Sequence, residues 1–375
     1  MRLKLPLFIC LIISSTFSCM KDEPLGRETD IVTFVVENNS YVDTDIRIDE
    51  AFIYVTDDVN LKKIAPKIEV SPGALISPAS GTEQDFSKGP VTYKVVSEDG
   101  KYSKEYVVTL IRLSTLNLKF DFENWKENAN MGYFDMQVKT EEGYLVKLWD
   151  SGNPGIAVVN KGEEFPTRPS LTSEAYSGNY AAKLETSYGG VKIGNIQIPI
   201  FSGSLFYGRF SLAGGIAEPR KCLRLGRLHQ EKAGKPVTFT GYYKYTKGSP
   251  YVYLDENKNE IRTDKIDDAF SIYAVLFKVT KGQSYDEYLD GITIMDSEKI
   301  VARADWKPEY DTEAEKGFTK FTIPFKYKNG EELDFTKNDY KLTIMFASSK
   351  DGNEYKGALG STLIVDEVEV ICDTE

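Results

Sequence analysis

The chain has 375 residues, with 57 acidic and 46 basic side chains, and its formal net charge at pH 7 is −11. Such acidity, without a basic tract, argues against nucleic acid as a partner, because nucleic-acid phosphates are bound by lysine and arginine. The length is enough for two domains with ordinary hydrophobic cores. One histidine and four cysteines form no Cys/His cluster, so the sequence predicts no structural zinc site.

Residues 1–18 have the order of a secretory signal peptide. Basic Arg2 and Lys4 precede an almost wholly apolar run, 5–13, which is followed by small polar residues and Cys19. The run is shorter than the about 20 residues that a membrane-spanning helix needs. Thr16-Phe17-Ser18-Cys19 resembles a bacterial lipobox, which implies that Cys19 becomes the N-terminus and carries acyl chains. The alternative is an ordinary signal peptide with an incidental cysteine.

Residues 19–29 are predicted to be a lipid anchor and a polar tether. Asp22 and Glu23 follow Cys19 closely, and this acidic start resembles the export signal of Bacteroides-type surface lipoproteins. The resemblance implies an outer-membrane protein that is exposed at the cell surface. Several acyl chains give stable anchoring, so the membrane would be contacted through the lipid anchor only.

Residues 30–113 are predicted to form an Ig-like β-sandwich of short strands rich in β-branched and aromatic residues. Asp99-Gly100 supplies the tight turn of a hairpin between the last two strands. Residues 71–81 and 93–100 resemble the Ig-like modules of Bacteroides-type surface lipoproteins, which implies a spacer. The expected strands are 31–37, 46–48, 51–56, 67–70, 91–96 and 106–111.

Residues 114–375 are predicted to form a second, larger all-β sandwich. It opens with a segment of alternating apolar and polar residues, 116–123, and closes with another β-rich run, 362–371. Such alternation is typical of a strand with one buried face. Further strands are expected at 180–185, 237–245, 272–279, 318–324 and 340–346.

Residues 340–352 and 357–368 resemble the C-terminal end of the "putative carbohydrate metabolism domain" of Bacteroides-type lipoproteins. Supporting similarities follow in the expected order at 120–125, 149–153 and 318–325. The resemblance implies a jelly-roll-like β-sandwich, similar to carbohydrate-binding modules and placed behind an Ig-like domain. It also implies a surface lipoprotein that binds glycan in carbohydrate capture, with outer-membrane glycan-uptake proteins as partners. An acidic surface suits a neutral glycan.

Sugar recognition needs flat aromatic faces with polar side chains around them. Trp149 stands directly before a polar, turn-rich stretch that includes Asp150 and Asn153, so we expect these three residues to contact the ligand. Tyr243 and Trp306 are further candidates. The alternative for each of these aromatic residues is core packing.

A structural calcium ion is the one cofactor that the sequence suggests. In carbohydrate-binding jelly rolls the first and last strands often share calcium, and Glu123 and Asp366 match those strand positions. Two residues fall short of the six to eight oxygens that calcium takes. The alternative is that Asp366 marks the end of a strand or caps a turn.

No catalytic residue can be nominated. A Ser/His/Asp mechanism would have to use His229, and no Gly-x-Ser-x-Gly motif accompanies it. A glycoside hydrolase or lyase acting through a carboxylate pair remains an alternative to non-catalytic binding, as does an adhesin or structural surface protein. Cys222 and Cys372 are either bridged or separate thiols.

Overall fold

The computed structural model describes residues 25–36, 41–56, 59–112, 118–159, 164–212, 218–283, 287–328 and 330–373. Within these ranges the chain is almost entirely strand, with a single short α-helix, α1 (Asn153–Val159). The predicted all-β class is therefore confirmed. The predicted signal peptide and Cys19 lie outside the described residues. No helix in the described ranges has the length and apolarity needed to span a membrane.

The first unit has a five-stranded sheet, in the order β2-β3-β7-β6-β5, and a two-stranded sheet, β1-β4. All neighbours are antiparallel except β3 and β7, which run parallel. The two sheets enclose a core of their own, in which Phe34 meets Tyr93 edge-on. Of the predicted strand 46–48, only Ile46 is strand, as the last residue of β2, and the other two residues belong to the turn into β3. The strands are β1 (Ile31–Val36), β2 (Tyr41–Ile46), β3 (Glu50–Val55), β4 (Pro66–Val70), β5 (Leu75–Ser77), β6 (Val91–Val96) and β7 (Ser103–Arg112).

The second unit is a larger sandwich of an eight-stranded and a seven-stranded sheet. The first has the path β12-β17-β28-β23-β24-β27 with β18 and β19 attached, and the second has β13-β14-β30-β20-β26-β25 with β8 attached. This architecture matches the predicted jelly-roll-like β-sandwich. The strands of the eight-stranded sheet are β12 (Trp149–Ser151), β17 (Ser204–Phe210), β18 (Leu223–Leu225), β19 (Arg227–His229), β23 (Ser271–Thr280), β24 (Ile300–Asp305), β27 (Lys326–Tyr327) and β28 (Asn338–Ala347).

The seven-stranded sheet is built on its two longest members, β20 and β30, which pair along most of their length. Its strands are β8 (Lys119–Phe120), β13 (Thr167–Pro169), β14 (Ala182–Glu185), β20 (Lys235–Thr246), β25 (Asp311–Glu315), β26 (Phe318–Pro324) and β30 (Thr362–Asp373). Smaller sheets are formed by β9 (Asn124–Glu127), β10 (Phe134–Lys139) and β11 (Leu145–Val146), by β15 (Ser187–Ile193) and β16 (Ile196–Phe201), and by β21 (Tyr251–Leu254), β22 (Glu260–Thr263) and β29 (Gly357–Ala358).

Both faces of the eight-stranded sheet are buried near its centre. Alternate residues of β23, such as Ile272 and Leu276, point into the main core between the sheets. The residues between them, such as Val275 and Phe277, join a second cluster on the outer face. Strands buried on both faces are apolar throughout rather than alternating, as in β23. Part of the outer face stays uncovered, and the candidate site described below lies there.

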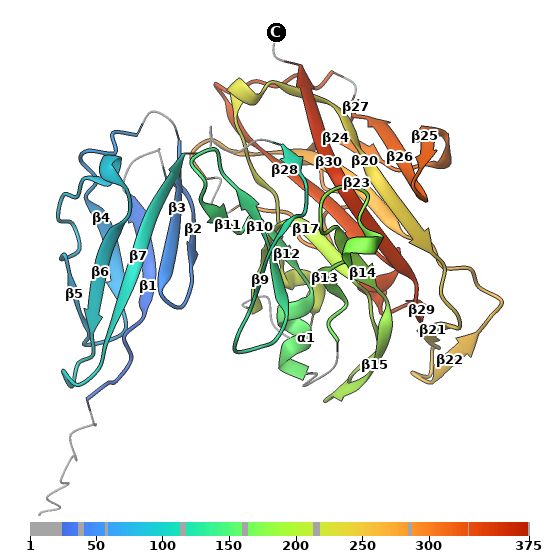
Figure 1. The fold of residues 1–375 in the computed structure, drawn as a ribbon, viewed down its shortest axis with the longest axis horizontal. Coiled ribbons are helices and arrows are strands. Elements are labelled where there is room, and N and C mark those ends of the chain that lie inside the picture. Colours follow the sequence, from blue (N-terminus) through green and yellow to red (C-terminus); the bar gives the residue numbers. More distant parts are fainter. Residues whose placement is uncertain are drawn as a thin grey trace, which may run out of the picture.

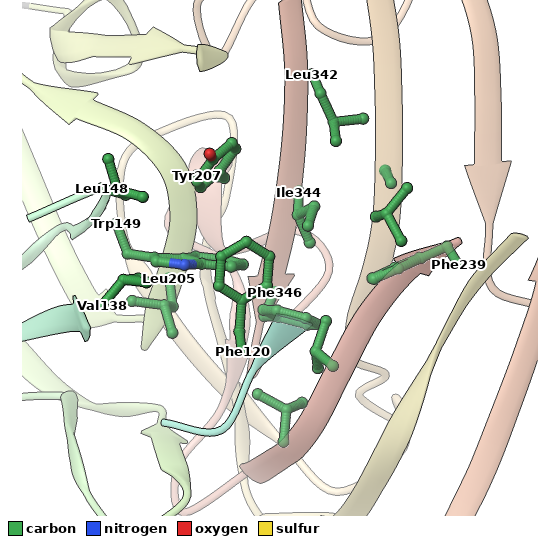
Figure 2. Close-up of a cluster of buried hydrophobic side chains, with 14 of the residues drawn as sticks. Phe120, Val138, Leu148, Trp149, Leu205, Tyr207, Phe239, Leu342, Ile344 and Phe346 are labelled. Carbon is green, nitrogen blue, oxygen red and sulfur yellow. The ribbon is translucent and has the colours of Figure 1, made fainter. Parts of the chain in front are cut away.

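Trp149 lies in the main core, as Figure 2 shows. Its side chain is fully buried, and its ring stacks on Phe346 at 5.9 Å and meets Phe120 edge-on at 4.9 Å. A ligand cannot reach a ring packed in this way. The predicted stacking platform at Trp149 is therefore corrected to a core residue, in line with the general tendency of large aromatic side chains.

The two units lie side by side and share part of one core (Figure 1). Phe52 and Tyr54 of β3 belong to the same hydrophobic cluster as Trp149 and Tyr207. Beside this contact, Asp43 of β2 forms ion pairs with both Arg209 and Arg227 of the second unit. The predicted boundary between the units, near 113–116, lies outside the described residues.

Candidate ligand-binding cleft

A cleft of about 460 Å³ lies over the outer face of the eight-stranded sheet. Its floor comes from β17, β23 and β28, and its walls come from α1, the β15–β16 hairpin and the segments 219–223, 291–295 and 349–355. Most of the lining is aliphatic or aromatic. A concave, mainly apolar cleft with a few polar groups is the usual form of a small-molecule site.

The wall around α1 is fixed by two of the residues that were predicted to bind ligand. Asn153 is fully buried, donates to the Thr167 carbonyl at 2.6 Å and accepts from the Thr167 amide at 3.3 Å. The buried Asp150 accepts from the Phe210 amide at 2.8 Å and pairs with Lys147 at 3.1 Å. Their polar groups are satisfied inside the protein, so both residues position the cleft wall rather than contact a ligand.

Trp306 lines one end of the cleft and is only partly buried. Its indole nitrogen donates to one carboxylate oxygen of Asp311 at 3.0 Å, and the Tyr243 hydroxyl donates to the other oxygen at 3.0 Å. Phe270 packs against the Trp306 ring with a centroid distance of 4.6 Å. The structure therefore brings Tyr243 and Trp306 together, with Trp306 at the cleft and the buried Tyr243 behind it.

Asp305 is the only carboxylate among the described residues that line the cleft. Arg303 donates hydrogen bonds from Nε and Nη2 to the Asp305 carboxylate oxygens, at distances of 2.7 to 3.2 Å. Arg303 also donates to the Ile294 carbonyl at 2.7 Å and lies over the ring of Tyr273. Glycoside hydrolysis usually needs two carboxyl groups about 5–9.5 Å apart. The described lining supplies one such group, and it is already neutralised.

Tyr355 is a functional candidate that sequence reasoning missed. Its backbone has a φ of 59°, a left-handed conformation that is strained for a bulky residue. Its hydroxyl is buried at the cleft and has no hydrogen-bond partner among the described residues. Burial raises the pKa of Tyr355 to about 12, so the hydroxyl stays protonated and able to donate. Strained residues with unused polar groups are typical of binding sites.

The predicted metal ligands, Glu123 and Asp366, both hold the loop that contains residues 176–180. Asp366 is fully buried and accepts from the amides of Tyr176 and Ser177, and Glu123 accepts from the amides of Asn179 and Tyr180. Burial raises the pKa of Asp366 to about 7.

These contacts do not suit a calcium ion. Amide N–H donors surround the two carboxylates, whereas calcium requires further oxygen ligands. No group of three or more His, Cys, Asp or Glu side chains that could hold a metal is found in the described ranges. The calcium expectation thus stays a prediction, and the donor set argues against it.

The environments of His229, Cys222 and Cys372 indicate structural roles. His229 is buried, its Nε2 lies 2.7 Å from the Gly234 carbonyl, and burial lowers its pKa, so the ring stays neutral. Cys222, which lines the cleft, and Cys372 are not joined by a disulfide. Burial raises the pKa of the Cys222 thiol, which makes it a poor nucleophile.

Comparison with known protein families gives two matches. Residues 121–371 match the family model described as "Putative carbohydrate metabolism domain". Residues 31–110 match a model described as "SGBP, N-terminal". A comparison with curated proteins finds no match.

Two similar solved structures are both described as putative glycoside hydrolases. The one from Bacteroides thetaiotaomicron VPI-5482 is 27% identical, has a TM-score of 0.78, and aligns over 95% of this chain and 99% of its own. The one from Bacteroides vulgatus ATCC 8482 is 29% identical, has a TM-score of 0.57, and aligns over 68% of this chain and 98% of its own. The first match therefore extends over both units.

Proposed function

Because the chain belongs to the "Putative carbohydrate metabolism domain" family, we propose that it is a cell-surface protein that binds glycan without cleaving it, in the cleft of the second unit. The match of the first unit to the "SGBP, N-terminal" model supports a surface glycan-binding protein of the Bacteroides type. In this proposal the first unit is a spacer and the second unit presents the cleft to the glycan.

The observation that carries the proposal is that Trp306 and Tyr355 both line one cleft. Trp306 offers a partly exposed aromatic ring whose position is fixed by Asp311, and the Tyr355 hydroxyl, buried in the cleft lining, has no partner in the described structure. A sugar ring presents C–H groups to an aromatic face and hydroxyls to hydrogen-bonding groups. Preorganised aromatic anchors also lower the entropic cost of binding.

A glycoside hydrolase is the second candidate, because two similar solved structures carry that description. Within the described lining, however, Asp305 is the only carboxylate, and its charge is neutralised by Arg303. A general acid needs a carboxyl group with a raised pKa beside a second carboxylate. The cleft geometry therefore favours binding over hydrolysis.

The proposed location follows from the sequence around Cys19. Acyl chains on Cys19 would anchor the protein in the outer membrane and place it beside glycan-uptake proteins. We expect Cys19→Ala to abolish acyl labelling and to release the protein from the membrane fraction, because no other cysteine follows a small residue at the end of the apolar run. Unchanged labelling in this variant would refute the anchor.

Glycan-array screening of the chain from residue 20 onward, followed by isothermal titration with the best glycan, tests the binding proposal. Trp306→Ala should weaken binding by about tenfold to a hundredfold if its ring is a central contact. Tyr355→Phe removes only the hydroxyl and should weaken binding by about fivefold. Tyr102→Phe, at an exposed position in the first unit, is the matched control and should change nothing.

Two results would overturn the proposal. The first is unchanged affinity in both cleft variants while their melting temperatures also stay unchanged, which would move the site elsewhere. The second is release of reducing sugar from a bound glycan, which would establish hydrolysis. Loss of that release in Asp305→Asn would then assign the reaction to the cleft.

A further inference from the structure

A second pocket, of about 280 Å³, lies next to the cleft at the edge of the eight-stranded sheet. It is formed by β24, β27 and the segment around 307–310, and Asp305 lines both this pocket and the cleft. Asp305, which is ion-paired with Arg303, therefore borders both cavities. A chain molecule in the cleft would reach this pocket by passing that pair.

The pocket is strongly basic, although the whole chain carries a net charge of −11. Arg303, Lys307, Lys326 and Lys328 line it, and Asp305 is the only carboxylate among its described lining residues. Since Arg303 already neutralises Asp305, the three lysines give the pocket its positive charge. A positively charged pocket attracts anionic ligands, even on a molecule whose net charge is negative.

The three lysines are positioned at the pocket by weak or uncharged partners, so their ammonium groups can still bind an anionic ligand. Lys326 lies over the ring of Tyr310 at 5.6 Å, and the Tyr310 hydroxyl raises the pKa of its ammonium group. Lys328 donates to the Ser297 carbonyl at 3.4 Å. Lys307 lies 3.9 Å from Glu309, and both side chains are more than half exposed, so this pair is weak.

Two tyrosines complete the pocket. Tyr310 and Tyr327 both line it and are partly buried. The Tyr327 hydroxyl donates to the Pro236 carbonyl at 2.8 Å, which fixes the ring at the edge of the sheet. Ile300 and Ala302 form an apolar floor. The pocket thus combines cations with rigid aromatic walls, a set that fits a charged sugar ring rather than a free inorganic anion.

We propose that this pocket is a subsite for an acidic sugar residue, bearing a carboxylate or a sulfate, within the glycan that the cleft binds. The inference rests on the proposed function and narrows its ligand class. The net charge of the chain favours a neutral glycan, but the lysines at this pocket favour an acidic one. Ammonium groups bind carboxylate and sulfate oxygens through charge-assisted hydrogen bonds.

The test compares probes that differ only in charge. Glucuronate and glucose share one ring and differ at carbon 6, where glucose 6-sulfate supplies the sulfate arm. Their binding to the chain from residue 20 onward is measured by saturation-transfer NMR at millimolar concentration. We expect at least one acidic probe to bind about fivefold more tightly than glucose, an advantage that shrinks in 0.5 M salt. The acidic probe that binds more tightly shows whether the pocket prefers a carboxylate or a sulfate.

Substitutions assign the preference to the pocket. Lys326→Gln combined with Lys307→Gln should remove the advantage of the acidic probe, whereas Lys62→Gln, at an exposed position of the first unit, should leave it intact. Equal binding of all three probes, or a preference that survives the double substitution, would overturn the subsite. If oligosaccharides bind in the cleft but show no acidic preference, only the subsite fails. If the monosaccharide preference is present but no oligosaccharide binds, only the proposed function fails.

Discussion

Asp43 of β2 and Arg227 of β19 form a 2.6 Å ion pair that joins the two units of the chain. Both side chains are about nine-tenths buried. Arg227 also donates to the carbonyls of Leu148, Lys147 and Gly208, so all three guanidinium nitrogens form hydrogen bonds. The pair lies beside the hydrophobic contact between β3 and the main core. The interface between the units therefore combines buried, paired charges with apolar contacts, as a protein interior does.

Breaking this pair should be costly. Asp43→Ala leaves Arg227 and Arg209 without their shared carboxylate, and removing one partner of a buried pair costs about 3–5 kcal/mol. Urea unfolding of the whole chain measures this loss. Asp267→Asn is the control, because its pair with Lys247 is exposed and should cost less than about 1 kcal/mol. Equal, small effects of both substitutions would mean that the interface pair contributes nothing.

The second unit alone should fold but be less stable than the whole chain. A fragment of residues 116–375 keeps both sheets and most of the main core, but it loses the contacts of Phe52 and Tyr54. Burial of such side chains contributes about 1.5–3 kcal/mol each, so the free energy of unfolding should fall by on the order of 3–6 kcal/mol. Calorimetry of the fragment and of the whole chain tests this. An unfolded fragment would mean that the unit boundary is misplaced or that the second unit needs the core it shares with the first.

Substitutions of Trp149 and Trp306 should separate effects on stability from effects on glycan binding. Trp149→Ala removes a fully buried ring and should cost about 3–5 kcal/mol of stability. Trp306→Ala removes a partly exposed ring, so we expect a smaller loss of stability and a clear loss of glycan affinity. Thermal melts beside isothermal titration give both quantities. A larger stability loss for Trp306→Ala than for Trp149→Ala would contradict the assignment of core and cleft.

Local patterns predicted the strands well, because period-two alternation is a property of neighbouring residues. The expected strand 91–96 is β6, and the expected strand 362–371 is most of β30. The opening segment 116–123 was predicted less well. In its described part only β8 is strand, and Phe122 adopts a left-handed φ of 52°, which ends the extended run.

The site was harder to predict, because its parts meet only through long-range contacts. Polar neighbours suggested an exposed loop at Trp149, yet those groups are satisfied by the Phe210 amide and by Thr167. Nothing local in the sequence shows such distant partners. Tyr243 and Trp306 were each plausible alone, but their meeting at Asp311 depends on the pairing of β20 with β26 and of β26 with β25.

Adding or chelating calcium should leave the stability of the protein unchanged. The carboxylates of Glu123 and Asp366 are surrounded by amide N–H groups, which satisfy them without a cation. We therefore expect the same melting temperature in excess EDTA and in millimolar calcium. A rise in the melting temperature with calcium that disappears in Asp366→Asn would instead support the calcium site, since binding to the folded state alone raises stability.

Asp366 should also give the protein a pH-dependent stability. Its pKa is about 7 in the folded protein, above its ordinary value of 3.8, because burial disfavours the charged carboxylate. Between these two values the folded state holds a proton that the unfolded state has lost. The stability that the protonated Asp366 side chain contributes is therefore fully present below about pH 4 and is lost as the pH rises through 7. Asp366→Asn keeps an acceptor oxygen but cannot ionise, so unfolding curves from pH 4 to pH 8 should show the wild type losing stability relative to this variant. Parallel curves for the two proteins would mean that the three amide donors from Tyr176, Ser177 and Glu367 keep the carboxylate charged despite its burial.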